Sequence, residues 1–273
     1  MQVVDLPIGL RFSTEAGWNQ SYYDWKVIYD QKSGNNWVAT IHDQVVGTVT
    51  SINYSSKFEW IGMMLVDRRH RRQGIGRKLM TKVIEHTSTG IMRLDASRMG
   101  AKLYSKLGFI EESRLIRFKK TMEPGKGSSN SQSIGTMSKS DLLDIIKVDQ
   151  QKVQYDRSDL IRSIYLRGAG YYFKANSEIR GYLFCRPGRR DWHFGPLVAE
   201  STRVAEILLL QALRSLIRQT AVLDVFDHQD AWVGRLRKLG FVESRDFIRM
   251  QLASDTPIFP TQHQYAIMGP AMG

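Results

Sequence analysis

An internal repeat constrains the fold of this chain more than any other feature of its sequence. The tetrapeptide Lys106–Phe109 recurs as Lys238–Phe241, which sets an offset of 240 − 108 = 132 residues. Further identities fall at the same offset without a gap: Trp60 and Trp192, Leu65–Val66 and Leu197–Val198, Arg71 and Arg203, Ile75 and Ile207, Asp95 and Asp227, Glu111 and Glu243, and Ile116–Arg117 and Ile248–Arg249. Matches spread over so long a stretch at one offset indicate the duplication of one domain.

A segment without apolar periodicity separates the two copies. Residues 122–140 are rich in Gly, Ser, Pro and Asn, a composition that is typical of a linker. We therefore predict a first domain over residues 1–122, a linker over 123–140 and a second domain over 141–273. The last part of the chain, residues 254–273, contains three prolines and little periodicity, and we predict a loop that follows the surface.

The apolar periodicity predicts a mixed α/β fold, in which helices flank a mixed sheet in each copy. In the first copy we expect strands at 8–12, 37–42, 45–54, 58–66, 91–96 and 109–118, and helices at 14–31, 74–87 and 99–106. In the second copy we expect strands at 192–198, 221–226 and 241–252, and helices at 203–219 and 230–238. The first helix carries an aromatic stripe that we interpret mainly as core packing, with Trp18 as a residue that could reach a substrate: Trp18, Tyr22, Trp25 and Tyr29.

A basic loop with two glycines carries the clearest chemical signal. It follows the apolar strand that ends at Val66, and a helix is expected to begin at its glycines. The first N–H groups of a helix are unpaired and lie at the positive end of the helix dipole, so they attract phosphate. Gly74 and Gly76 have no Cβ atoms, which lets a diphosphate lie against the backbone. The candidate phosphate-binding residues are Arg71, Arg72, Gln73, Gly74, Ile75, Gly76 and Arg77.

The pattern Arg-x-x-Gly-x-Gly after a strand that ends in valine resembles the acetyl-CoA signature of the GNAT superfamily of N-acetyltransferases. Residues 103–109 resemble the second signature of that superfamily, and the two stand in the right order. The tandem layout is similar to a bacterial type with a degenerate second copy. The resemblance implies two tandem acyl-CoA N-acyltransferase domains with acetyl-CoA as the co-substrate. Ser97 stands where many members have Asn and Arg68 where many have Pro; we keep Ser97 as a candidate cofactor-binding residue.

The resemblance also implies direct attack of an amine on the thioester, without a covalent enzyme intermediate. Tyr104 matches the general acid of the superfamily, and an ordinary phenol with a pKa of about 10 is protonated at neutral pH. A backbone N–H at Leu65 or Val66 is expected to polarise the thioester oxygen, which develops negative charge. Cys185, the single cysteine, is interpreted as a core residue.

The attacking amine must lose a proton, because a lysine-like amine with a pKa of about 10.4 is mostly charged at pH 7. A general base is therefore expected. We take Glu59, at the start of the strand over 58–66, as the candidate catalytic base, and Asp95 on the following strand is the alternative. The spacing of His, Cys, Asp and Glu predicts no metal site.

The second copy differs at the positions that matter most for the cofactor. At the offset of 132, Gly74 corresponds to Glu206, and Tyr104 corresponds to Leu236. We therefore predict that the second copy has lost its own cofactor site. Its expected role is to support the first domain and to shape the acceptor site.

The composition leaves two alternatives to an enzyme. A net charge of +12, spread over both halves, would also suit a basic protein associated with nucleic acid, although we do not expect nucleic acid as a partner. An acyl-CoA sensor without turnover is the other alternative. The sequence shows no secretion signal and no long apolar run, so we predict a cytoplasmic protein without a membrane partner. The amine acceptor, the acyl chain length and the oligomeric state stay open.

Overall fold

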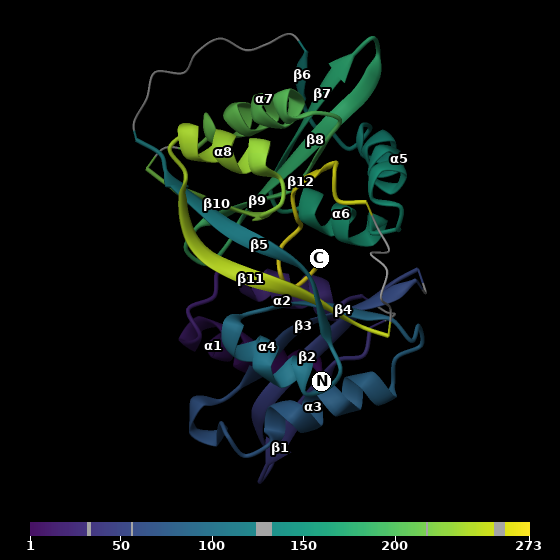
Figure 1. The fold of residues 1–273 in the computed structure, drawn as a ribbon, viewed down its shortest axis with the longest axis vertical. Helices are drawn as coiled ribbons and strands as arrows, with labels where there is room; N and C mark the ends of the chain where they lie inside the picture. Colours follow the sequence, from purple (N-terminus) through teal and green to yellow (C-terminus); the bar gives the residue numbers. More distant parts are fainter. Residues whose placement is uncertain (32–33, 56, 124–132, 217, 254–259) are drawn as a thin grey trace. The chain divides into compact units, whose positions relative to one another are not determined.

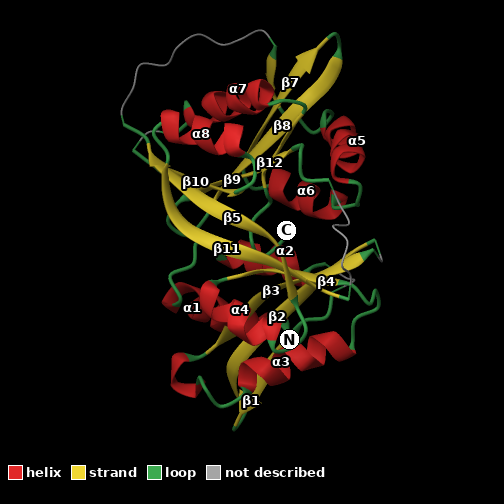
Figure 2. Ribbon diagram, viewed as in Figure 1, coloured by secondary structure: helices red, strands yellow, loops and turns green. Residues whose placement is uncertain are grey.

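The structure is a computed structural model that describes the chain apart from residues 32–33, 56, 124–132, 217 and 254–259. The chain forms two compact units. Unit 1 comprises Met1–Glu112, Ile248–Thr256 and Pro270–Gly273, and unit 2 comprises Ser113–Phe247 and Pro257–Gly269. Each unit combines helices with strands, which confirms the mixed α/β class (Figure 2). The units interleave along the sequence, so the boundaries at residues 122 and 140 stay a prediction.

Unit 1 holds most of the first copy of the repeat, whose helices and strands are labelled in Figure 1. Its elements, in chain order, are η1 (Val3–Asp5), α1 (Leu6–Glu15), α2 (Tyr22–Tyr29), β1 (Trp37–Ile41), β2 (Gln44–Tyr54), β3 (Phe58–Val66), η2 (Arg68–His70), α3 (Ile75–Glu85), β4 (Met92–Ala96), α4 (Arg98–Ser105) and the start of β5 (Ile110–Thr121).

The N-terminal segment differs from the prediction. Residues 8–12 form part of α1 instead of a strand, because Pro7 is well suited to the first turn of a helix and Leu6, Gly9 and Phe12 recur at helical spacing on its buried side. The predicted long helix is broken at Gly17, whose φ is 74°. Of the aromatic stripe, Trp25 is fully buried and its Nε1–H donates to Ser13 Oγ at 3.1 Å.

The sheet of unit 1 runs in the order β1, β2, β3, β4 and the C-terminal part of β11 (Val242–Leu252). The first three strands are antiparallel, and β3 and β4 are parallel. The strands predicted at 37–42 and 45–54 are present as β1 and β2, and they form a hairpin with positive φ at His42 and Asp43, as a two-residue turn requires. Helix α3 covers one face of the sheet and packs Leu79 and Val83 against Ile61.

Unit 2 carries the second copy. Its elements, after the greater part of β5, are β6 (Ile134–Thr136), α5 (Leu142–Val153), α6 (Ser158–Tyr165), β7 (Ala169–Ala175), β8 (Glu178–Pro187), β9 (Trp192–Ala199), α7 (Thr202–Leu213), β10 (Thr220–Phe226), α8 (Asp230–Lys238), the start of β11, and β12 (Gln264–Ala266). The strand order is β5, β10, β9, β8, β7 and β6, and β12 pairs with β9.

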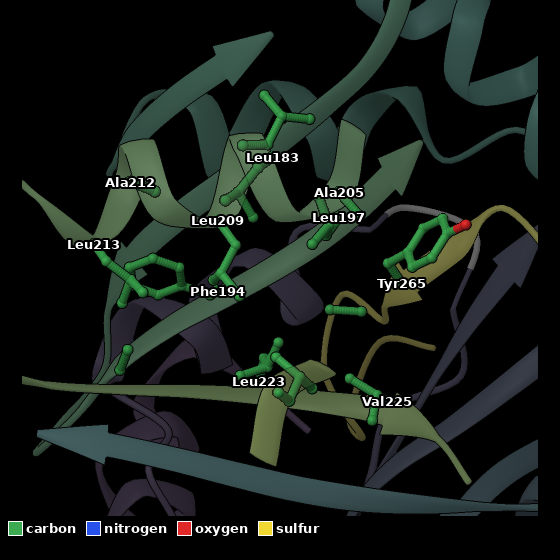
Figure 3. Packing of buried hydrophobic residues seen from close by; sticks show 14 of the residues in the cluster. Leu183, Phe194, Leu197, Ala205, Leu209, Ala212, Leu213, Leu223, Val225 and Tyr265 are labelled. Atoms are coloured by element: carbon green, nitrogen blue, oxygen red, sulfur yellow. The ribbon is translucent and has the colours of Figure 1, made fainter. Parts of the chain in front are cut away.

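The core of unit 2 lies between its sheet and α7, and Figure 3 shows Leu209 of α7, Phe194 of β9 and Leu223 of β10 among its side chains. Within the segment expected to be a linker, residues 123–140, Ile134–Thr136 form β6 and pair with β7. The helix expected over 203–219 ends at Leu213.

The two copies exchange their last strands. In unit 1, β4 pairs with residues 248–252 of β11, which belong to the second copy; in unit 2, β10 pairs with β5, which belongs to the first copy. A buried ion pair marks each junction. Arg249 holds Asp95 through Nε at 2.9 Å, and Arg117 holds Asp224 through Nε at 2.7 Å. The residue that corresponds to Asp95 is therefore Asp224, and the pairing of Asp95 with Asp227 by the ungapped offset is wrong.

We predict that Arg249→Met lowers the free energy of unfolding by about 3–5 kcal/mol, because it removes the guanidinium that is ion-paired with the buried Asp95 carboxylate. The double variant Asp95→Leu/Arg249→Met should recover most of the loss, since it removes both charges. Urea-induced unfolding followed by circular dichroism measures both effects. The control is Arg237→Met, whose ion pair with Glu243 is exposed and should change the stability by less than about 1 kcal/mol. Equal losses in Arg249→Met and in the control would contradict this account.

Candidate active site

The loop between β3 and α3 is tied down by its own side chains. The Asp67 carboxylate accepts hydrogen bonds from the Arg69 backbone N–H and from Arg69 Nη2, both at 2.9 Å. These bonds, with the Arg11 guanidinium at 3.6 Å, hold the pKa of Asp67 at about 2, below its ordinary value of 3.8. Arg71 Nε donates to the Val66 carbonyl oxygen at 3.1 Å. The loop is thus fastened to the end of β3.

The loop brings the backbone to the first turn of α3 in a left-handed conformation. Arg72 has a φ of 62°, and Gly74, the N-cap residue of α3, has a φ of 77°. A Cβ atom at Gly74 would meet no atom within 4 Å, so the space beside the first turn of α3 is open. Because the first N–H groups of a helix have no partner within the helix, this end of α3 can bind an anion.

The side chains around this helix end suit a diphosphate. Arg72, Gln73 and Arg77 are exposed, and Ile75 and Gly76 are half-buried. Within the described residues no ion pair involves Arg72 or Arg77, so their charges are available to a phosphate group. The predicted phosphate-binding residues therefore come together around one helix end, and their chemistry fits the diphosphate of CoA.

A gap opens beside this loop in the sheet of unit 1. The registered pairs between β3 and β4 are Glu59–Met92 and Trp60–Arg93. Across the described part of both strands no further pair is registered, although β3 continues to Val66 and β4 to Ala96. The two strands therefore diverge toward the end of β3 that carries the loop. We refer to this opening as the splay.

A β-bulge in β3 turns backbone groups toward the splay. Thr48 pairs with Leu65 and Thr50 with Gly62, so two residues of β3 oppose one of β2, and Met63 has a φ of 49°. Successive N–H groups of a strand point to opposite edges. The N–H of Asp67 donates to Val46 of β2, so that of Val66 points away from β2. Of the two predicted oxyanion donors, the geometry favours Val66 over Leu65.

Helix α4 follows β4 directly and carries two predicted residues. Ser97 is its N-cap, and its Oγ accepts from the Gly100 N–H at 3.2 Å, which gives Ser97 a structural task. Tyr104 is buried in the apolar cluster beneath α3, with its ring 6.0 Å from that of Phe109. Burial raises the pKa of the Tyr104 hydroxyl above its ordinary value of 10, so the phenol keeps its proton.

The two candidate bases lie in different environments. Glu59 is fully buried at the start of β3, and burial raises its pKa, while hydrogen bonds from the Ser88 backbone and from Ser51 partly oppose the rise. Asn35 Nδ2 lies 3.4 Å from Glu59 Oε1. Asp95 is held by Arg249, as described above. An ion-paired carboxylate is a poor proton acceptor, so the geometry does not favour Asp95.

The equivalent region of unit 2 has lost the loop. Only Glu200 and Ser201 connect β9 to α7, and Ser201 caps the helix by accepting from the Val204 N–H at 3.4 Å. The alignment of Gly74 with Glu206 by a fixed offset is wrong, because the shortened loop shifts the helix in the sequence. Glu206 lies inside α7, where its carboxylate accepts from Arg235 Nε at 2.7 Å.

The chain's own C-terminal segment fills the gap between β9 and β10. These strands register only at Trp192–Ala221 and His193–Val222 in the part of the chain that the structure describes. Beyond these pairs β12 pairs with β9, and the Ile267 N–H donates to the Asp224 carbonyl oxygen of β10 at 2.9 Å.

Residues 264–268 are therefore buried, and the predicted surface loop over 254–273 is wrong for them (Figure 3, Tyr265). In the sequence, the apolar residues between Pro260 and Pro270 were the sign that this segment could be buried. The structure also indicates three residues of the candidate site in unit 1 that the sequence analysis did not assign to it: Met63 at the bulge, and Trp60 and Gly62 on β3.

Among the residues that the structure describes, no group of three or more His, Cys, Asp and Glu side chains is placed so that it could hold a metal ion. No helix among these residues has the length and apolar character needed to cross a membrane.

Comparison with known proteins places both halves in one family. Family models described as "Acetyltransferase (GNAT) domain" match residues 32–111 and residues 145–266. A protein named holothin acyltransferase, from a Pseudoalteromonas species, is 23% identical over 244 residues, which cover 85% of this chain and 80% of that protein.

Two further proteins are similar to this chain. The Bacillus subtilis protein named uncharacterized N-acetyltransferase YitH is 23% identical over 217 residues, covering 78% of this chain and 76% of its own length. The structure of a candidate acetyltransferase from Pyrococcus horikoshii superposes with a TM-score of 0.84 at 22% identity, covering 100% of this chain and 94% of that one, which shows a shared fold.

We predict that Asp67→Asn loosens the loop and weakens acetyl-CoA binding, because it removes the charge that holds Arg69. The pKa of Asp67 is lowered in the folded state, so its carboxylate stabilises the protein above its ordinary pKa of 3.8 and loses that contribution as the pH falls toward about 2. Urea unfolding at pH 6 and at pH 3 should therefore show a smaller acid-induced loss of stability in Asp67→Asn than in the wild type. The same loss in both proteins would contradict the assignment.

Proposed function

The chain belongs to the GNAT acetyltransferases and contains two GNAT domains in tandem, and from that premise we propose that its first copy transfers an acetyl group from acetyl-CoA to a primary amine. One observation carries the proposal. In the described residues, the first copy combines a basic loop, an open helix N-terminus and a splay across which no further strand pair is registered, whereas the second copy has a two-residue connection and a gap that β12 and Ile267 fill.

In this proposal the diphosphate of acetyl-CoA binds at the N-terminus of α3. The backbone from Gln73 to Gly76 approaches it, and Arg71, Arg72 and Arg77 neutralise its charge. The pantetheine arm then lies in the splay beside Leu65 and Val66. The thioester then lies between Val66 and the bulge at Met63, because the splay narrows from the loop toward Trp60 and Arg93.

Acetyl-CoA supplies a thioester, whose carbonyl carbon the amine nitrogen attacks as the C–S bond breaks. The N–H of Val66 donates to the carbonyl oxygen while that oxygen carries negative charge. The hydroxyl of Tyr104 donates a hydrogen bond, or its proton, to the leaving thiolate sulfur. The raised pKa of Tyr104 keeps this group protonated across the physiological range.

Glu59 is the proposed route for the amine proton. Burial raises the pKa of Glu59 toward neutral pH. A carboxylate with such a pKa accepts a proton more readily than one with an ordinary pKa does. Glu59 is fully buried, so the proton would have to reach it through an intervening group, and Asn35 is the neighbour best placed to organise that step.

The second copy is proposed to support the active first copy. It contributes residues 248–252 and 270–273 to unit 1, which supports a role in shaping the acceptor side. Holothin is the first acceptor to try, since one relative is named holothin acyltransferase. An acyl-CoA sensor remains the second candidate, and it would bind acetyl-CoA without acceptor-dependent release of CoA.

Calorimetric titration of acetyl-CoA into the wild type and into Gly74→Glu tests the cofactor site. We expect one equivalent to bind the wild type and none to bind Gly74→Glu, because a carboxylate would occupy the place of the diphosphate. The matched control is Gly90→Glu. Gly90 also has a positive φ, of 70°, and open space around its Cβ position, but it lies in another loop. Binding to Gly74→Glu as tight as to Gly90→Glu would contradict the proposal.

Tyr104→Phe tests the acid. With any amine that the wild type acetylates, we expect kcat to fall by about 100-fold and the acetyl-CoA dissociation constant to stay within about two-fold. The pH–rate profile of the wild type should also show no decrease up to about pH 10 from this residue, because its pKa is raised. Unchanged kcat in Tyr104→Phe would remove the residue from the mechanism.

A further inference from the structure

The narrow end of the splay, where β3 and β4 become paired, limits the space for an acyl group. In the proposed function, on which this inference rests, the diphosphate lies beside Gly74 and the acyl group lies toward Trp60 and Arg93, where β3 and β4 become paired. A longer acyl chain cannot continue between the paired strands. It has to leave the sheet through one of its two faces.

One of these faces is filled by the core. Ile61 of β3 and Leu94 of β4 pack with Leu79 and Val83 of α3, and all four side chains are buried. Pushing extra methylene groups into a packed core forces side chains out of their preferred rotamers. This face therefore gives no room to an acyl chain.

The other face of β3 is covered by residues 270–273. A Cβ atom at Gly62 would lie 2.6 Å from the Ala271 carbonyl oxygen, so the segment rests directly on the strand backbone. Trp60 Nε1–H donates to the Pro270 carbonyl oxygen at 3.2 Å, and the Tyr54 hydroxyl donates to the Met272 carbonyl oxygen. Trp60 and Met272 are each 2% exposed, so the cover is close.

The residues that precede this segment are fixed within unit 2. Trp232 Nε1–H donates to the Tyr265 carbonyl oxygen at 2.7 Å, and Arg186 Nη2 donates to the Met268 carbonyl oxygen at 2.8 Å. These bonds, together with the pairing of β12 and β9, anchor the segment on its N-terminal side. Residues 270–272 are thus held by their own contacts with Trp60 and Tyr54 and by an anchored chain before them.

We propose that residues 270–272 determine the acyl-chain length that the first copy accepts, by closing the second exit at the narrow end of the splay. The substrate class is then a short-chain acyl-CoA, with acetyl as the preferred group. The C-terminal segment, which belongs to the second copy, acts as a specificity-determining wall for the first.

The test measures the binding of acetyl-CoA, hexanoyl-CoA and free CoA to the full chain and to a variant that ends at Gly269. We expect the wild type to bind hexanoyl-CoA at least about 10-fold more weakly than acetyl-CoA, because the longer chain clashes with the wall. In the shortened variant the two affinities should come within about two-fold of each other or reverse, since each newly buried methylene favours binding by about four-fold.

A second variant covers the case in which the shortened chain does not fold, as judged by circular dichroism. Trp60→Phe/Tyr54→Phe keeps an aromatic ring at both positions but removes both side-chain donors to the segment, and it should bind hexanoyl-CoA more tightly than the wild type does. The control is Trp25→Phe, which loses an equally buried indole donor in the same unit but leaves the segment untouched and should keep the wild-type preference.

Two results would overturn the inference while leaving the proposed function intact. One is equal binding of acetyl-CoA and hexanoyl-CoA by the wild type. The other is an unchanged preference in the shortened chain or, where that chain does not fold, in the double variant. Failure of free CoA and of acetyl-CoA to bind the wild type would instead overturn the proposed function, and this inference with it.

Discussion

The exchange of last strands is the constraint on which both units depend. β4 would be an open edge of its sheet without residues 248–252, and an unpaired edge is costly and prone to wrong pairing. The Arg249–Asp95 ion pair fixes the register of this exchange, because a slip by one residue would leave two buried charges apart. The strand beside the proposed cofactor site, β4, is therefore paired along its outer edge by the second copy. Neither copy can form its complete sheet without a strand from the other.

The two copies share the divergence of two parallel strands but differ in what lies beside it. In unit 1 the divergence of β3 and β4 lies beside a basic loop and the open N-terminus of α3. In unit 2 the divergence of β9 and β10 is filled by β12, which pairs with β9, and by Ile267, whose N–H donates to the Asp224 carbonyl oxygen of β10. Buried backbone groups need partners. In the second copy the chain itself supplies such partners, and in our proposal acetyl-CoA supplies them in the first copy.

The sequence predicted the parts of the structure that local rules determine. Gly74 and Gly76 marked the start of α3, and the strands around Trp60 and Trp192 followed from apolar runs. It failed where tertiary packing decides. Residues 8–12 read as a strand until the helical spacing of Leu6, Gly9 and Phe12 is placed against a core. A fixed offset could not reveal that the loop before α7 had shortened, so Glu206 was misplaced. The burial of residues 264–273 depends on gaps that no local pattern encodes.

Hydrogen–deuterium exchange of the full chain, with and without acetyl-CoA, tests the central claim most directly, because it reports on both copies in one experiment. The account predicts slower exchange in peptides that cover Met63–Val66 of β3 and Gly74–Arg77 at the start of α3. It predicts no change in peptides that cover β9 and the first turn of α7. Protection in the second copy, or protection in neither, would contradict the assignment of the cofactor site to the first copy.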